Sequence, residues 1–251
     1  MILAVNVGNT NTHSGLFSGD NLIRDMYVPT DELEYSGNRF SLLVKKQMIT
    51  AAGVSSVVPG KDAFLSRFLK TNLNVVPEFI TGKIKLPVKL KVLNIRSLGS
   101  DRICNAVAGY SYFKRKNNVM IVDCGTAITY DVVLKNGNYE GGAIAPGLSL
   151  LAGSLNQYTS KLPLLGQSDF KIRENPVGKH TFDALNSGII NAFVDSVNGM
   201  ISKIIRYYKR DFKVVLTGGD GGFLLHELKH TAVLKKDCVL DGINIIMKEI
   251  G

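Results

Sequence analysis

The sequence predicts a mixed α/β protein that is built from two related halves. A polar loop occurs twice, as Asn6-Val-Gly-Asn-Thr-Asn-Thr and as Asp123-Cys-Gly-Thr-Ala-Ile-Thr, and the two copies lie 123 − 6 = 117 positions apart in a chain of 251 residues. Each copy follows an apolar run typical of a buried strand and precedes a run with strand propensity. Patterns typical of strands and of helices then alternate along each half. We therefore expect two α/β halves that face each other across a cleft.

Local patterns predict the elements of each half. Short apolar or alternating runs indicate strands, apolar residues three or four positions apart indicate helices, and Asn136-Gly137 indicates a hairpin turn. The expected strands are residues 2–5, 13–17, 22–28, 51–58, 75–80, 119–122, 128–134, 139–144 and 214–217. The expected helices are residues 31–48, 61–70, 103–113, 148–157 and 182–210, with one more after the glycines at 218–222. The polar residues 114–118 are the expected boundary, which gives the halves 1–116 and 117–251.

Composition is that of a protein with a sizeable core, with 45% hydrophobic and 20% charged residues. The formal charge is 30 − 21 = +9, but the basic residues are scattered, which favours a solvated surface that attracts anionic substrates over a nucleic-acid-binding patch. Three widely separated cysteines without CxxC spacing indicate a reducing, cytoplasmic location. The first apolar run is broken at Asn6, so neither a signal peptide nor a membrane span is expected.

The repeated loop has the chemistry of a phosphate-binding turn. Glycine lets backbone N–H groups approach a ligand, and Thr or Asn beside it adds neutral donors. Two ordinary polar hairpins are the alternative, but the repetition favours a pair of loops that binds one polyphosphate. The chain contains neither GxxxxGK[ST] nor GxGxxG, which excludes a P-loop and a dinucleotide fingerprint. The glycines at 218–222, between a strand and a helix, can accept a phosphate or leave room for a nucleotide.

A second polar motif begins the helix at 103–113. The helix dipole favours Asp101 at this position, where its commonest role is that of a cap. Arg102 gains nothing from the dipole, which suggests that it binds a carboxylate or phosphate. The apolar stripe of the long helix at 182–210 indicates core or a subunit interface rather than a cofactor site.

Several motifs follow one another along the chain. They are Val5-Asn-Val-Gly-Asn-Thr-Asn-Thr, Leu98-Gly-Ser-Asp-Arg, Val122-Asp-Cys-Gly-Thr-Ala-Ile-Thr, Gly141-Gly-Ala-Ile-Ala-Pro-Gly and Leu216-Thr-Gly-Gly-Asp. Together, and over nearly the whole chain, they resemble the type III pantothenate kinase family. The resemblance implies two tandem ribonuclease-H-like domains facing across a nucleotide cleft, as in the acetate and sugar kinase, Hsp70 and actin superfamily. It also implies phosphorylation of pantothenate to 4′-phosphopantothenate, the first step of coenzyme A biosynthesis, by a homodimer that uses ATP, Mg²⁺ and K⁺ or NH₄⁺.

The resemblance also assigns roles to residues of this chain. Asp101 would be the general base for the hydroxyl of pantothenate, and Asp123 would bind the monovalent cation. Thr181 would contact pantothenate from the neighbouring subunit, so that the substrate site lies near the dimer interface. The residues expected at pantothenate are Gly99, Ser100, Asp101, Arg102 and Thr181. The residues expected at ATP are Asn6, Val7, Gly8, Asn9, Thr10, Asn11, Thr12, His13 and Thr126.

Three positions depart from the family pattern. Asn6 stands where the family has an aspartate that organises Mg²⁺, Val92 where members often have a tyrosine, and Gly153 where they often have a histidine. A working pantothenate kinase is the leading prediction, because the expected base, arginine and cation ligand are all present. One alternative is a weakened paralogue with a regulatory or nucleic-acid-associated role, similar to Bvg accessory factors. The other is a kinase for another small hydroxy acid.

Overall fold

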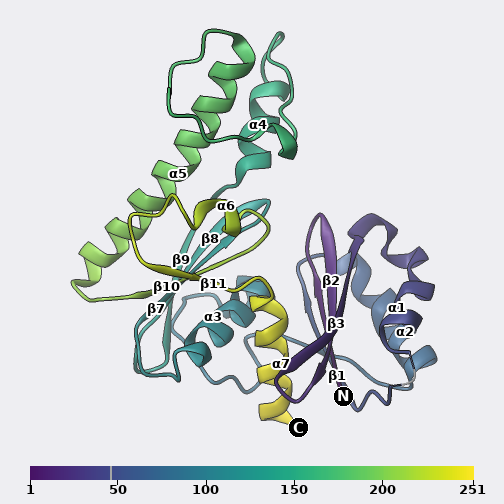
Figure 1. Cartoon of the computed structure of the whole chain (residues 1–251). Helices are drawn as coiled ribbons and strands as arrows, with labels where there is room; N and C mark the ends of the chain where they lie inside the picture. The colour runs from purple at the N-terminus through teal and green to yellow at the C-terminus, as the bar shows by residue number, and fades with distance from the viewer. Residues whose placement is uncertain (46) are drawn as a thin grey trace. The chain divides into compact units, whose positions relative to one another are not determined.

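The computed structural model describes residues 1–45 and 47–251, and the chain divides into two compact units (Figure 1). The first unit contains Met1–Val119, Asp131–Gly141 and Asp237–Gly251, and the second contains Met120–Tyr130 and Gly142–Lys236. The two units are interleaved along the sequence. The division into related halves at residues 116 and 117 is a different division, and it stays a prediction.

The first sheet is a meander extended by two parallel strands. Its strands are β1 (Ile2–Val7), β2 (Asn11–Ser18), β3 (Asn21–Pro29), β4 (Ala51–Ser56) and β5 (Glu78–Phe79), in the order β3-β2-β1-β4-β5. β1, β2 and β3 pair antiparallel, whereas β4 pairs parallel with both β1 and β5. The antiparallel part is the meander that the sequence predicts for this half.

Helices cover both faces of the first sheet. On one face, Leu65 and Leu69 of α2 (Asp62–Leu73) and Phe40 of α1 (Gly37–Leu43) pack with apolar residues of β1 and β4. On the other face lies α7 (Cys238–Ile250), where a Cβ atom placed on Gly53 of β4 would be 2.5 Å from the side chain of Ile243. Glycine in this strand therefore lets α7 pack directly onto the sheet.

The second sheet repeats the strand order of the first. Its strands are β6 (Lys89–Leu90), β7 (Val119–Cys124), β8 (Ala127–Val133), β9 (Asn138–Pro146), β10 (Lys213–Thr217) and β11 (Ala232–Leu234), in the order β11-β10-β7-β8-β9-β6. Without β6 and in the reverse direction, this order is β9-β8-β7-β10-β11. It matches the order β3-β2-β1-β4-β5 of the first sheet strand for strand. The additional strand β6 lies at the sheet edge beside β9. The predicted mixed α/β class with a repeated topology is thus confirmed.

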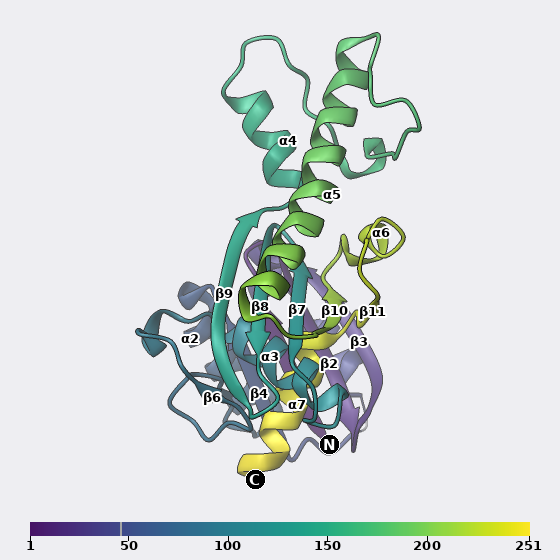
Figure 2. The same ribbon diagram turned by 90° about the vertical axis from the view of Figure 1, so that its left-hand side faces the viewer.

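The long helix α5 (Thr181–Tyr208) forms the core of the second unit. Its buried residues Ile189, Phe193 and Val197 recur at helical spacing and pack with Val122 and Tyr130 of the second sheet. Figure 2 shows α5 running across the strands and continuing past them to α4 (Leu148–Gln157). Of the two alternatives for the apolar stripe, core is therefore correct for this part of the helix.

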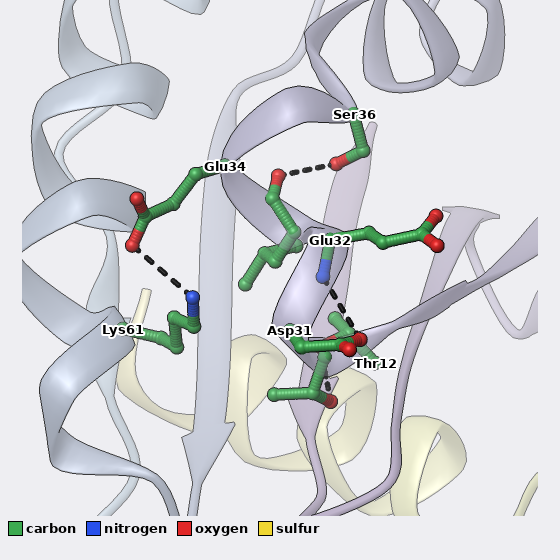
Figure 3. A network of polar contacts seen from close by, with 8 residues as sticks. Thr12, Asp31, Glu32, Glu34, Ser36 and Lys61 are labelled. Atoms are coloured by element: carbon green, nitrogen blue, oxygen red, sulfur yellow. Dashed lines mark hydrogen bonds and ion pairs between the residues drawn. The ribbon is translucent and has the colours of Figure 1, made fainter.

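Short segments differ from the sequence prediction. The predicted helix 31–48 is a 3₁₀ helix η1 (Thr30–Tyr35) followed by α1, and Lys46 in that range lies outside the described residues. The break falls at Ser36, whose hydroxyl donates to the carbonyl of Leu33 at 2.6 Å (Figure 3). The predicted strand 75–80 is reduced to β5, since Pro77 has no N–H to donate to a ladder.

The remaining helices include α7, which the sequence reasoning missed. Helical spacing of Leu240, Ile243 and Met247 is the signal that could have located it. The other helices are α3 (Ser100–Tyr112), α6 (Gly221–Leu224), η2 (Pro59–Lys61), η3 (Ile95–Ser97) and η4 (Gln167–Asp169). Among residues 1–45 and 47–251, no helix has the length and apolar character needed to cross a membrane.

Candidate active site

Hydrogen bonds of two buried threonines fix the conformation of the loop between β1 and β2. The Gly8 N–H donates to the carbonyl of Asn11 at 3.1 Å, and the Thr30 hydroxyl donates to the Gly8 carbonyl at 2.7 Å. The Thr12 hydroxyl lies 3.1 Å from that of Thr30, and both threonines are buried (Figure 3). The exposed residues of the loop are Asn9, Thr10 and Asn11. A fixed loop with an exposed polar tip fits the predicted phosphate-binding role.

Asn6 presents a buried side-chain oxygen that lacks a partner in the described part of the chain. Its Oδ1 atom has no hydrogen-bond partner among residues 1–45 and 47–251. A buried acceptor without a donor is costly, so in a native protein it calls for a water, ion or ligand. A Mg²⁺-bound water or a protonated ligand group would satisfy the Asn6 oxygen. This part of the chain therefore fits the Mg²⁺·ATP that the family pattern implies.

Asp101 lies at the second position of α3, where its carboxylate folds back onto the helix start. Its Oδ1 atom accepts from the Arg102 backbone N–H at 2.8 Å. A Cβ atom on Gly99 would come 2.5 Å from Oδ1, so glycine at that position leaves room for the carboxylate. Burial raises the pKa of Asp101 above its ordinary value, and the Arg102 N–H and charge oppose that rise. Asp101 thus makes the cap-like contact and is also a stronger base than an exposed aspartate.

Ser100 anchors the same helix start to the first sheet. Its hydroxyl lies 3.0 Å from that of Ser55 and donates to the Ser56 carbonyl at 3.1 Å. Both partners belong to the end of β4. Asp101 is therefore positioned by a sheet strand as well as by its own helix.

Arg102 forms a buried ion pair that the sequence reasoning did not anticipate. Its Nε donates to Oδ1 of Asp131 at 2.8 Å, and Tyr139 donates its hydroxyl to the same oxygen at 2.6 Å. Nη2 also lies 2.7 Å from that oxygen, but without hydrogen-bond geometry, so we regard Nε as the donor. Asp131 is fully buried. The guanidinium is therefore oriented by an internal carboxylate.

A charged residue inside a strand is the signal that could have located Asp131. It interrupts the apolar and aromatic residues of β8, and a buried carboxylate needs a partner. The approach of Arg102 depends on tertiary structure, because the two residues are separated by 29 positions in sequence. Val92 follows β6 by two residues and lies close to β9. A Cβ atom placed on Gly141 of β9 would be 3.4 Å from the Val92 side chain.

The second unit contains the second copy of the polar loop, with Asp123 near the end of β7. The Gly147 N–H donates to the Thr126 carbonyl at 3.0 Å, and the Asp220 N–H donates to the Cys124 carbonyl at 3.0 Å. Gly218 has a φ of +82°, and a Cβ there would lie 2.5 Å from Oδ1 of Asp123. The loop after β7 is thus enclosed by two glycine-containing turns.

Asp220 adds a second carboxylate beside this loop. Burial raises the pKa of Asp220, and Gln167, which donates to it at 3.4 Å, opposes the rise. The sequence motif contains Asp220, but sequence reasoning assigned a role only to the glycines around it and none to its carboxylate. Thr181, by contrast, is exposed at the first position of α5, and Gly153 faces open space on α4. Within the second unit, Asp123 and Thr126 share one loop, and Thr181 belongs to a different segment.

Alanine at Gly147 tests how tightly the Thr126 loop is packed. A Cβ atom at this position would lie 2.2 Å from the Gly125 carbonyl oxygen and 2.7 Å from that of Thr126, both backbone atoms. Because the loop must shift, we expect Gly147→Ala to lower the free energy of unfolding by roughly 1–3 kcal/mol. Urea unfolding of both proteins measures this difference.

Gly199→Ala is the matched control for this prediction. Gly199 lies inside α5, and apart from the helix's own backbone no atom of the described residues lies within 4 Å of its added Cβ. Alanine there should stabilise the protein by roughly 0.5–1 kcal/mol, because it lowers the entropy of the unfolded chain without a clash. Equal effects at both positions would contradict the close approach at Gly147.

The two sheets of the same strand order define a fold of two ribonuclease-H-like domains. A solved structure from Campylobacter jejuni, described as a Baf family transcriptional activator, has a TM-score of 0.63 and 22% identity, and the match covers 99% of this chain and 98% of that one. An inorganic polyphosphate/ATP-glucomannokinase from Arthrobacter sp. strain KM has a TM-score of 0.52 and 13% identity, covering 99% and 98%. These likenesses define the fold.

Sequence comparison then gives the family. The model of the type III pantothenate kinase family matches residues 2–203. A type III pantothenate kinase from Sulfurihydrogenibium sp. is 35% identical, covering 99% of this chain and 100% of the relative. One from Desulfosudis oleivorans is 33% identical, covering 98% of each. The chain belongs to the type III pantothenate kinase family, and the resemblance noted from the motifs is confirmed.

Proposed function

We propose that this protein phosphorylates pantothenate with ATP to give 4′-phosphopantothenate, the first step of coenzyme A biosynthesis. The observation that carries the proposal is the match to the family over nearly the whole chain. It is supported by the half-buried Asp101 at the start of α3, whose pKa is raised by burial. Phosphoryl transfer needs positioning and charge stabilisation more than covalent chemistry. The residues of this chain supply both.

Asp101 is proposed to orient the primary hydroxyl of pantothenate and to accept its proton. Its carboxylate is held by the Arg102 N–H, and burial makes it a better base at neutral pH. Arg102 is proposed to bind the substrate carboxylate through guanidinium N–H groups not used by Asp131. Gly99 and Ser100 complete the proposed contacts with pantothenate, together with Thr181 of a second subunit.

ATP phosphates are proposed to bind the loop from Val7 to His13, and Thr126 as well. The shape of the first loop is set by buried threonines, and its polar tip lies at the surface, where a ligand can reach it. Asn6 would hold Mg²⁺ through its unsatisfied oxygen, and Asp123 would bind K⁺ or NH₄⁺. When bound, Mg²⁺ would neutralise negative charge on the transferred phosphoryl group.

A homodimer is proposed on the basis of exposed apolar residues around α4 and α5. Single exposed apolar residues are common, but a group of large ones marks an interaction surface. Its members are Leu150, Leu155, Tyr158, Leu164, Ile172, Val177 and Phe182. Thr181 precedes Phe182 in this part of the chain, and the family resemblance assigns it a contact with pantothenate in the neighbouring subunit. A cytoplasmic location is part of the same proposal.

The function is tested by ATP turnover with pantothenate, Mg²⁺ and K⁺, with 4′-phosphopantothenate identified by mass spectrometry. ADP formation should depend on pantothenate and should stay at background with other small hydroxy acids. No turnover with pantothenate, together with turnover of another hydroxy acid, would overturn the substrate assignment.

Asn6→Asp should lower the Mg²⁺ concentration needed for half-maximal turnover. A carboxylate anchors Mg²⁺ better than an amide oxygen of the same geometry, because it adds negative charge. The measurement is a Mg²⁺ titration of initial rates for both proteins, with Asn21→Asp, exposed at the start of β3 and outside the proposed ATP loop, as the control for added charge. The same half-maximal Mg²⁺ concentration for wild type and Asn6→Asp would contradict a metal role for position 6.

A further inference from the structure

Three possible metal ligands converge in the first unit beside the loop proposed to bind ATP, and one of them, His13, is the last residue of that loop. They are His13 of β2, Asp25 of β3 and Asp237, the residue before α7. One ligand atom from each residue lies within 4.8 Å of the others. The site is assembled from segments far apart in sequence and needs only the first unit.

The separations fit coordination by one ion. Nε2 of His13 lies 3.0 Å from Oδ2 of Asp25 and 4.0 Å from Oδ1 of Asp237. Ligand atoms at about 2.0–2.2 Å from a tetrahedral Zn²⁺ are about 3.4 Å apart, so both separations are within about 0.6 Å of the required value. Asp25 and Asp237 are partly exposed, which leaves access for an ion from solvent.

The charges around His13 also favour a cation. In the described part of the chain, neither Asp25 nor Asp237 forms an ion pair with a lysine or arginine, and His13 is the ion-pair partner of both. Burial lowers the pKa of His13, although Asp25 and Asp237 oppose that shift, and the neutral imidazole is the form that metals bind. Two carboxylates around a neutral imidazole leave negative charge that a divalent ion would neutralise.

Neighbouring side chains orient the imidazole and leave one more oxygen nearby. The ring of Tyr27 stacks on that of His13 with centroids 3.8 Å apart and an interplanar angle of 11°. Asn6 is the register partner of His13 on β1, so their Cβ atoms are roughly 5 Å apart on one face of the sheet. The Asn6 Oδ1 atom is buried and has no partner in the described residues. The same oxygen is proposed above to hold Mg²⁺, so the two cation sites would be neighbours on this face of the sheet.

We propose that His13, Asp25 and Asp237 bind a divalent transition metal such as Zn²⁺, with water in the remaining coordination positions. One imidazole and two carboxylates suit Zn²⁺ better than Mg²⁺, which prefers octahedral oxygen ligands. The site ties β2 and β3 to the start of α7. It would therefore join the first sheet to the helix that covers it, beside the loop that follows β1.

Binding of Co²⁺ and Zn²⁺ to the untagged full-length protein, without nucleotide or pantothenate, tests the proposal. Co²⁺ should bind with one-to-one stoichiometry and give the enhanced visible absorption of a low-coordinate site, and Zn²⁺ should displace it. Loss of a residue that only supports a metal ligand already lowers metal affinity by roughly 10–100-fold. Loss of a ligand itself should cost at least as much, so we expect Co²⁺ affinity to fall at least tenfold in Asp25→Asn and in His13→Gln. Asp25→Asn is the safer variant, because Asp25 is partly exposed on an outer strand.

His230→Gln is the matched control, because His230 pairs with Ser202 in the second unit and should leave Co²⁺ binding unchanged. The three cysteines are buried and should not compete for the metal. Absence of one-to-one Co²⁺ binding to wild type, or equal affinity of wild type and Asp25→Asn, would show that the cluster is an ion pair only. Because the assay contains no substrate, its result is independent of whether the protein phosphorylates pantothenate.

Discussion

Asp101→Ala is expected to lower kcat for pantothenate phosphorylation by roughly 10²–10⁴-fold, the range for loss of a positioned general base. Folding should change little, because burial disfavours the Asp101 carboxylate and the helix-start interaction it loses contributes only about 0.3–1 kcal/mol. Steady-state kinetics and thermal unfolding of the same preparations separate the two effects. A loss of activity with an unchanged unfolding midpoint would support the catalytic role.

Asp62→Ala is the control for Asp101→Ala, since Asp62 lies in the first turn of α2 in the same unit. It should keep wild-type kinetics. The pH profile gives an independent check: the carboxylate must be ionised to act as base, so kcat/KM should fall as pH drops through the raised pKa of Asp101. That acid limb should lie above the ordinary aspartate value of 3.8. An Asp101→Ala protein with wild-type kcat would exclude Asp101 as the base.

Asp131→Ala is expected to lower the free energy of unfolding by about 3–5 kcal/mol, the usual cost of removing one partner of a buried ion pair. Asp131 is fully buried and accepts from both Arg102 and Tyr139, so its loss leaves a guanidinium and a hydroxyl without their acceptor. Urea unfolding measures the loss. KM for pantothenate should rise as well, because the guanidinium proposed to bind the substrate is no longer oriented.

Asp131→Asn separates charge from shape at the same position. Asparagine keeps an oxygen that can accept from Tyr139 and Arg102 but carries no charge, so it should be less destabilising than alanine. Tyr139→Phe removes one donor only and should cost about 0.5–1.5 kcal/mol. If Asp131→Ala cost less than Tyr139→Phe, the ion pair with Arg102 would contribute nothing measurable to stability.

Elements whose patterns are local could be predicted from the sequence. The helix α4 was predicted at residues 148–157, which are its observed bounds, and Asn136-Gly137 forms the predicted hairpin turn with a φ of +83° at Gly137. The repeated loop predicted two similar halves, and the two sheets have the same strand order. In each of these cases the deciding signal lies within about ten residues of the element or repeats along the chain.

Features that depend on distant partners could not be predicted in this way. The partner of Arg102 is Asp131, and the neighbours of His13 include Asp237, which lies more than two hundred positions away along the chain. Hydrophobic periodicity says which face of an element is buried, but not which element covers it. The roles assigned to the site residues came from family resemblance and stay predictions until they are tested by substitution.

The position of α7 has a consequence for how the chain folds during synthesis. This helix covers one face of the first sheet, but its residues are made only after the whole second unit. Until then the apolar face around Gly53 and Gly15 is uncovered in the nascent chain. Contacts of such long sequence separation form late, because the intervening loop must be closed first. The first unit is therefore completed only after the residues of α7 have been made, and until then chaperones would have an exposed apolar surface to bind.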